Sequence, residues 1–262
     1  MPSVRPGGER DAAHRRALAW LCTLALVLLA LPFLLPAMPQ PQHYHDFADR
    51  RGWLGIPNFG DVVSNAAFLF AALAGAWAMR GERFRAMPAA PRRAYRTMFA
   101  GLALTAFGSA WYHWAPSDAR LVWDRLPMTL VFMPLLAATL AERLHWRSDL
   151  PLVALCLLGV ASVAGWKFGG NLTPYLVAQV GAILLLLACV LLLPSQWTGR
   201  GALFAAMGWY LVAFLCERGD HAVFAFTRGM VSGHTCKHIA AALALYCVAA
   251  MLRRQQLRME RA

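Results

Sequence analysis

Eight long apolar runs dominate the chain and constrain its fold more than any other feature. A helix needs about 20 apolar residues to cross a bilayer, and each run is close to that length. Of the 262 residues, 59% are hydrophobic, which is far above the share in a soluble domain. The sequence therefore predicts an all-α, polytopic transmembrane helix bundle that forms one domain. The predicted spans are residues 17–37, 61–79, 95–115, 122–142, 150–168, 174–193, 201–217 and 234–252.

The placement of positive charge predicts how the bundle is oriented. Seventeen of the 25 Lys and Arg residues lie before the first run, in the segments that follow every second run, or, for Arg96, at the adjoining end of the next run. Cytoplasmic segments of membrane proteins are enriched in these residues, so both termini are predicted to be cytoplasmic. Arginine greatly outnumbers lysine, as in proteins of GC-rich bacteria, which suggests a bacterial inner (plasma) membrane. Nucleic-acid binding is not indicated, because the basic residues lie between apolar runs rather than along one polar face.

The two ends of the chain are polar and basic. Residues 1–16 and 253–262 are predicted to be cytoplasmic tails. The first run, 17–37, follows two arginines as a signal peptide would. It is long for a signal peptide, however, and the PAMPQPQ that follows it is a poor cleavage site. We therefore interpret it as an additional membrane helix that precedes a core of residues 38–252.

Two histidines stand four residues apart at the start of the last run, in the segment SGHTCKHIAAALALYCVAAMLRR. Residues at this spacing share one face of a helix, so His234 and His238 should point the same way. Taken alone, the pair fits either packing or metal binding. Haem is a poorer alternative, because bis-histidine ligation needs facing helices. Cys236 and Lys237 are predicted to point off this face and to take no part in the chemistry.

Further polar residues are predicted to lie at the same, outer end of the bundle. Ser109 and His113 are four residues apart near the end of the third run, and Asp124 stands near the start of the fourth. Each has a simple interpretation alone: an interfacial histidine, a small packing serine or a capping aspartate. Ionisable residues inside spans are expensive, however, and are generally functional. Their shared depth with His234 and His238 therefore predicts a site.

Three histidines with an open fourth position are typical of a catalytic zinc site. Zinc lowers the pKa of a bound water toward about 7 and polarises a carbonyl group. A neighbouring carboxylate, here Asp124, can accept a proton from the water and pass it to the leaving group. A hydroxyl one helical turn from a ligand, here Ser109, can donate to the developing oxyanion. The residues therefore predict a hydrolase acting inside a membrane. A transporter is less well supported, because several spans hold almost no ionisable residues.

Three short motifs resemble the alkaline ceramidase family of the CREST superfamily of membrane hydrolases. Members of that family carry S-x-x-x-H, then D-E-L-P-M, then H-x-x-x-H in the last helix. This chain has Ser109 and His113 for the first motif and Asp124, followed by RLPM, for the second. His234 and His238 supply the third. Upstream, IPNFGDVVSN resembles the stretch that opens the first core helix of the family.

The resemblance implies a seven-helix CREST-like core that the first run precedes. It implies that His113, His234 and His238 are zinc ligands. Asp124 would deprotonate the attacking water, and Ser109 would stabilise the oxyanion. The implied reaction is hydrolysis of the amide bond of ceramide, or of a related membrane lipid. A receptor-like or regulatory CREST protein with a structural zinc, or a hydrolase of another lipid amide or ester, would carry the same motifs.

The chain departs from the family pattern in two places. Arg125 replaces the acid of the D-E-L motif. The acidic segment that binds calcium in eukaryotic ceramidases is absent, and Asn58 stands where one of its glutamates would fall. Asp46, Asp49 and Asn58 could form a weaker calcium site from oxygen ligands. The alternative is that the loop 38–60 is a hydrogen-bonded lid.

Overall fold

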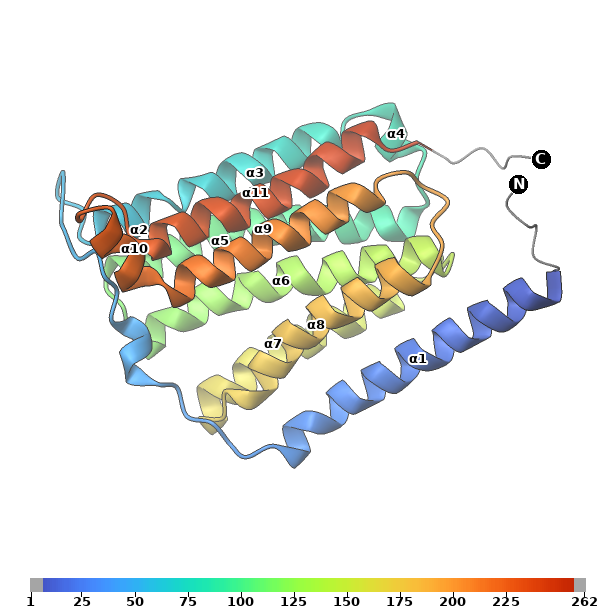
Figure 1. Ribbon diagram of the computed structural model, residues 1–262, viewed down its shortest axis with the longest axis horizontal. Coiled ribbons are helices and arrows are strands. Elements are labelled where there is room, and N and C mark those ends of the chain that lie inside the picture. Colours follow the sequence, from blue (N-terminus) through green and yellow to red (C-terminus); the bar gives the residue numbers. More distant parts are fainter. Residues whose placement is uncertain (1–6, 257–262) are drawn as a thin grey trace.

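The computed structural model describes residues 7–256, and this part of the chain is helical without a β-strand (Figure 1). The predicted all-α bundle is therefore confirmed. The helices, including one 3-10 helix (η1), are α1 (Gly7–Leu34), η1 (Gln42–His45), α2 (Phe59–Val63), α3 (Ala66–Ala78), α4 (Glu82–Arg85), α5 (Ala89–Trp114), α6 (Asp118–Arg143), α7 (Leu150–Gly169), α8 (Thr173–Leu192), α9 (Arg200–Arg218), α10 (Asp220–Phe226) and α11 (Gly233–Arg254).

Seven of the described helical segments are long and apolar enough to cross a membrane, so the protein is an integral membrane protein by length and composition. Eight spans were predicted, and the difference is α5. This helix has 26 residues, as many as α6, and packs along it. It falls short in hydropathy because Arg92, Arg93 and Arg96 stand near its start and Trp, Tyr and His residues fill its last turns.

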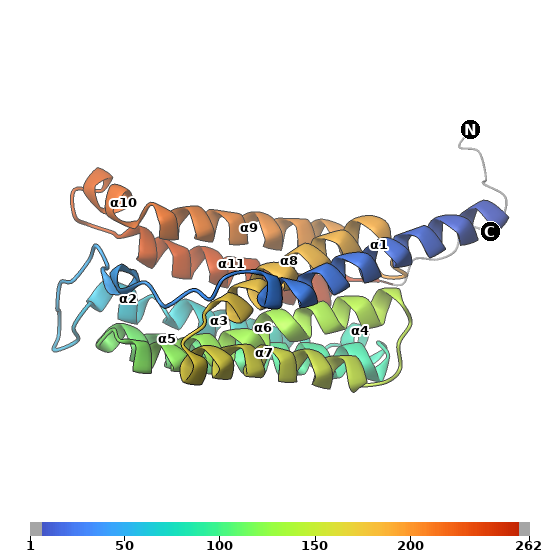
Figure 2. The same ribbon diagram turned by 90° about the horizontal axis from the view of Figure 1, so that it is seen from below.

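The bundle begins and ends on the same side. In Figure 1, α1 begins and α11 ends at the end of the bundle where α4 lies. Figure 2 shows the long helices running roughly side by side between the two ends. The main neighbour of α1 is α8, so α1 lies at the edge of the bundle.

The structure corrects the predicted boundaries at three points. Helix α1 begins at Gly7, so much of the predicted N-terminal tail is helical; residues 1–6 and 257–262 lie outside the described part. The predicted span 61–79 is interrupted at Ser64 and Asn65, where α2 ends and α3 begins. Short helices that the hydrophobic pattern does not mark, among them α10, occupy the connections.

Two serines fix the starts of α6 and α11 at the same end of the bundle. The Ser117 side chain accepts a hydrogen bond from the Arg120 amide, and the Ser232 side chain accepts one from the Thr235 amide at 2.9 Å. Each serine satisfies an amide that the first turn of a helix leaves without a partner. The Ser232 cap thereby places His234 in the first turn of α11.

Glycines allow α5 and α6 to approach until their backbones touch. A Cβ atom on Gly108 would lie 1.9 Å from the Trp123 carbonyl oxygen, and one on Gly101 would lie 2.4 Å from the Leu130 carbonyl oxygen. Both distances are far inside van der Waals contact, so no larger residue fits without separating the helices. This close approach sets the C-terminal turns of α5 against the start of α6.

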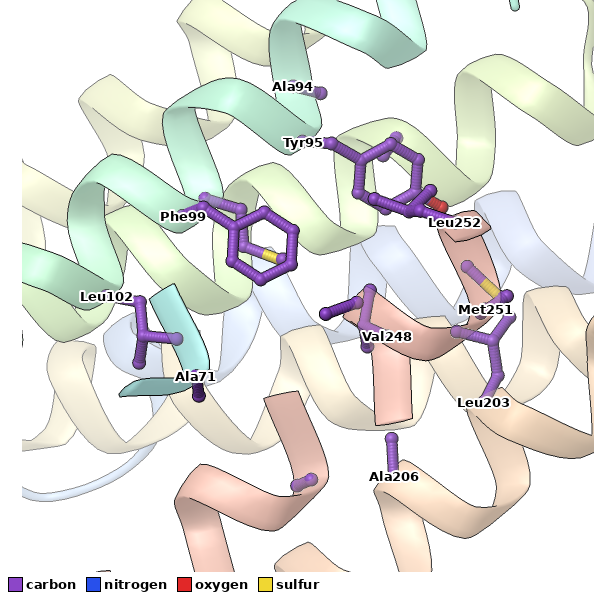
Figure 3. Packing of buried hydrophobic residues seen from close by; sticks show 14 of the residues in the cluster. Ala71, Ala94, Tyr95, Phe99, Leu102, Leu203, Ala206, Val248, Met251 and Leu252 are labelled. Atoms are coloured by element: carbon purple, nitrogen blue, oxygen red, sulfur yellow. The ribbon is translucent and has the colours of Figure 1, made fainter. Parts of the chain in front are cut away.

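The apolar core fills the half of the bundle near the ends of the chain. In Figure 3, Tyr95 and Phe99 of α5 lie close to Val248 and Leu252 of α11. All four side chains are at most 3% exposed. The other end of the same two helices carries buried polar residues instead. Helix α3 packs against both α5 and α11, so the apolar packing holds that polar end in place.

Candidate metal centre

Three histidines meet inside the polar end of the bundle. His113 is the next-to-last residue of α5, while His234 and His238 lie one turn apart on α11. Their exposed fractions are 0%, 3% and 1%. One ring nitrogen from each lies within 4.8 Å of the other two, so the group could hold a metal ion. We call these three residues the triad, and the end of the bundle that contains them the triad end.

The ring nitrogens of the triad fit a metal ion better than a network of hydrogen bonds. His113 Nε2 and His234 Nε2 are 3.2 Å apart. The Nε2 atom of His238 is buried and has no hydrogen-bond partner among the described residues. Three nitrogens bound to one tetrahedral zinc at about 2.05 Å would be about 3.3 Å apart. The spacing and the unpartnered nitrogen are therefore both compatible with a bound metal ion.

A hydrogen bond to Ser64 sets the protonation of His238. The Ser64 hydroxyl lies 2.7 Å from His238 Nδ1 and donates to the Asp61 carbonyl oxygen at 3.2 Å. A hydroxyl has one proton to donate, so Ser64 accepts the Nδ1 proton of His238. The Nε2 atom then carries a lone pair that faces the triad. Such an outer hydrogen bond orients a metal-binding histidine and fixes its tautomer.

The Ser64→Ala variant is expected to bind zinc about 10- to 100-fold more weakly than the wild type, because it removes this acceptor. Competition with a zinc chelator in detergent solution measures the change. The matched control is Ser162→Ala, which removes a buried serine that bonds only within α7. Equal zinc affinity in Ser64→Ala and the wild type would contradict the role assigned to Ser64.

Asp124 and Ser109 form a second buried pair beside the triad. Asp124 is 6% exposed and Ser109 is 2% exposed. The Ser109 hydroxyl lies next to the Asp124 carboxylate, across the contact that Gly108 permits. Asp124 is not part of the group of mutually close ligand atoms, which the three histidines form alone among the described residues. The Asp124 carboxylate is therefore not a member of that set of close ligand atoms.

The loop between α1 and α2 covers the triad. The Phe47 ring packs edge-on against His113 and His234, with ring centroids 4.7 and 4.5 Å apart, and is 6% exposed. The Asn58 side-chain amide donates to the His113 carbonyl oxygen at 2.8 Å. Asp220 joins the loop to α11, because its carboxylate accepts from the Ala48 amide at 2.9 Å and from the His234 amide at 2.8 Å. The loop is thus a hydrogen-bonded cover.

The oxygen atoms suggested as a calcium site are separately engaged. Asp46 pairs with Arg50, and Asp49 forms a two-point pair with Arg51 at 2.7 and 2.8 Å. This hydrogen bonding from Arg51 lowers the pKa of Asp49 from its ordinary value. Asn58 uses its amide to hold α5 instead. The loop residues therefore serve as parts of the cover in this structure.

Tryptophans surround the triad end on the outside. Trp53, Trp111, Trp114 and Trp123 are between 43% and 61% exposed. This arrangement is typical of the aromatic belt at a membrane interface. Tyr112, which stands between Trp111 and Trp114 in the sequence, is instead 1% exposed and hydrogen-bonds with His45 Nδ1 at 2.8 Å. Tyr112 is therefore part of the site's support and not of its surface.

Several polar residues near the triad were given no role from the sequence. Lys237 was expected to point away from the site, but its amine lies in the bundle 2.6 Å from the Glu217 carboxylate of α9. The Tyr44 hydroxyl donates to the same carboxylate at 3.2 Å. Burial, followed by the charge of Glu217, raises the pKa of Tyr44 above its ordinary value. Asp61 accepts hydrogen bonds from Ser232 and Thr235, each at 2.9 Å.

Neither a protein-family model nor a curated protein matches the chain. The site must therefore be assigned from its own residues. The described part of the chain is a membrane-helix bundle with a buried group of three histidines that could bind a metal ion.

Proposed function

We propose that the protein is an integral membrane, zinc-dependent amidohydrolase that cleaves the N-acyl amide bond of a ceramide-like lipid. The observation that carries the proposal is the convergence of the triad with Asp124 and Ser109 at one end of an apolar bundle. The motifs that hold these residues resemble those of the alkaline ceramidases. The bond attacked in that family joins a long acyl chain to an amino group.

The metal has a plain chemical role in such a site. The triad would hold zinc through three neutral imidazole nitrogens, and bound zinc would polarise the amide carbonyl and promote ionisation of a water molecule. The exposure of the three rings, at most 3%, keeps bulk water from competing for the metal.

The residues beside the triad would handle protons and charge. Asp124 would accept a proton from the attacking water and return it to the amine that leaves. Ser109 would donate its proton toward the oxygen that gains negative charge, or hold Asp124 in the required orientation. The oxygen of the water forms a bond to the acyl carbon, and the bond between this carbon and the amide nitrogen breaks. The products are a fatty acid and an amine.

Bundle and cover would position the lipid. Its acyl chain would lie among the apolar side chains of the helices, and the polar end would lie near the loop that carries Phe47 and Tyr44. The cover would keep bulk water away from the reacting atoms while the attacking water is bound, which would strengthen electrostatic interactions there.

Turnover of a lipid amide tests the proposal. Purified, zinc-loaded protein is expected to release a fatty acid from at least one N-acyl lipid amide. A comparison of lipids in cells that carry the wild type or His234→Ala should show the same substrate accumulating in the variant. If the wild type turns over no lipid amide or ester, and the variant unfolds on losing zinc, the metal is structural and the hydrolase assignment is wrong.

A further inference from the structure

A buried arginine without an anionic partner lies directly beside Asp124. Arg125 follows Asp124 on α6 and is only 4% exposed. Its Nη1 atom is buried and has no hydrogen-bond partner among the described residues. The same residues provide no carboxylate within 4.0 Å of its guanidinium. A charge buried in this way is strongly unfavourable unless something neutralises it.

The nearby carboxylates already have partners. Glu217 accepts from Lys237 and from Tyr44. Asp124 lies against Ser109, and neighbours in sequence on a helix do not face each other. Arg125 therefore interacts with Asp124 and Glu217 only through charge at longer range, and its buried Nη1 donor has no acceptor among the described residues.

Three aromatic rings hold the guanidinium in a fixed position. Its central carbon lies over the rings of Trp166 of α7 at 4.4 Å, Tyr175 of α8 at 4.9 Å and Tyr44 of the cover at 5.4 Å. Each distance is within the range of a cation–π contact. Contacts of this kind place no anion beside the guanidinium, and its Nη1 atom has no hydrogen-bond acceptor among the described residues. The rings therefore fix the group but do not satisfy its donors.

We call the three rings of Tyr44, Trp166 and Tyr175 the cage. Its position suggests how a polar group could reach Arg125. Trp166 also lines a pocket at the triad end, together with Gln40, Gln42 and Lys167. Tyr44 belongs to the loop that covers the triad and hydrogen-bonds to Glu217. The guanidinium thus contacts a ring that also forms part of the wall of a surface pocket, and Arg125 directly follows Asp124 in the sequence.

We propose that Arg125 binds an oxyanion, a carboxylate or phosphate, on the polar end of the substrate. The proposal rests on the proposed amide hydrolysis and deepens it. The preferred substrates would be acidic lipid amides rather than neutral ones such as ceramide. A guanidinium pairs with either oxyanion through two parallel N–H donors, which would satisfy Nη1 and neutralise the buried charge. Arg125 acts here as a binding residue for the polar end, one position from the group that handles the proton.

The test compares three lipid amides with the same acyl chain: N-acylglycine, N-acyl-O-phosphoethanolamine and neutral N-acylethanolamine. Zinc-loaded wild type is expected to show a kcat/KM about 10- to 100-fold higher for at least one acidic substrate than for the neutral one, the range of a charge-assisted hydrogen bond. The acidic substrate with the higher value identifies carboxylate or phosphate as the group bound.

Variants of Arg125 then assign the preference to this residue. In Arg125→Met, kcat/KM for the acidic substrate divided by kcat/KM for the neutral substrate is expected to fall toward one. Arg125→Lys should keep part of the preference for the acidic substrate. The matched control is Arg120→Met, which removes an arginine from the same end of α6. Arg120 stacks on Trp111 and donates to its carbonyl oxygen, so the control should keep the wild-type ratio.

The outcomes separate this proposal from the hydrolase assignment. Equal hydrolysis of all three substrates by the wild type would overturn the anion site and leave the hydrolase in place. If no substrate is hydrolysed, thermal shifts with the same three compounds measure binding. A larger shift with an acidic compound that disappears in Arg125→Met, but remains in Arg125→Lys, would support the anion site without the hydrolase. Equal thermal shifts of the wild type with all three compounds would overturn the anion site.

Discussion

His234→Ala is expected to lose both stoichiometric zinc and hydrolysis of lipid amides. His234 contributes the nitrogen that lies 3.2 Å from His113 Nε2, so its removal leaves two ligands of three. Loss of an outer hydrogen bond alone lowers metal affinity by about 10- to 100-fold, so loss of a direct ligand should exceed about 100-fold. Zinc content of the purified protein, measured by elemental analysis, and fatty-acid release give the two readouts.

The control for this variant is His145→Asn. His145 is exposed on the connection after α6 and has a left-handed backbone conformation that asparagine tolerates. This control should keep zinc and activity. Size-exclusion elution of His234→Ala must match the wild type for the comparison to concern the site. A folded His234→Ala protein that keeps one zinc and full activity would contradict the assignment of the triad.

Asp124→Asn is expected to keep zinc but lose activity by about 100- to 10,000-fold, the usual contribution of a general acid or base. The amide has the size of the carboxylate but cannot accept the proton of a water. Retained zinc follows because Asp124 lies outside the set of close ligand atoms. Steady-state kinetics and zinc analysis on the same preparation measure both effects.

Asp118→Asn is the matched control for Asp124→Asn. Asp118 lies in the first turn of α6, partly exposed, where its carboxylate contacts His45 and Gln42. The same substitution there should leave kcat/KM within a few-fold of the wild type. Loss of zinc in parallel with activity in Asp124→Asn would instead make Asp124 a ligand or a structural residue.

The helices and the triad could be predicted from the sequence because their signals are local. Apolar runs of about 20 residues mark spans, and the four-residue spacing of His234 and His238 places both on one helical face. The order of the predicted spans then placed His113 at the same end of the bundle. In the structure, one ring nitrogen of each histidine lies within 4.8 Å of the other two. Among the long described helices, α5 is less apolar than the others, because it carries arginines at one end and site residues at the other.

The remaining parts of the site depend on contacts between distant segments. Tyr44 comes from the short 3-10 helix η1 and Phe47 from the loop after it, and no periodicity in the sequence reveals the path of this segment. Lys237 was placed off the ligand face correctly by helical spacing, but that direction leads to Glu217 of α9 and not to lipid. Arg125 was visible as a departure from the family motif, yet its cage draws on α7, α8 and the cover.

The most direct test of the central claim is whether zinc and hydrolysis of a lipid amide depend on each other in the purified protein. The account predicts about one zinc per chain, loss of fatty-acid release when a chelator removes it, and recovery when zinc is restored. A preparation free of metal that still hydrolyses the lipid amide at the wild-type rate would contradict the account.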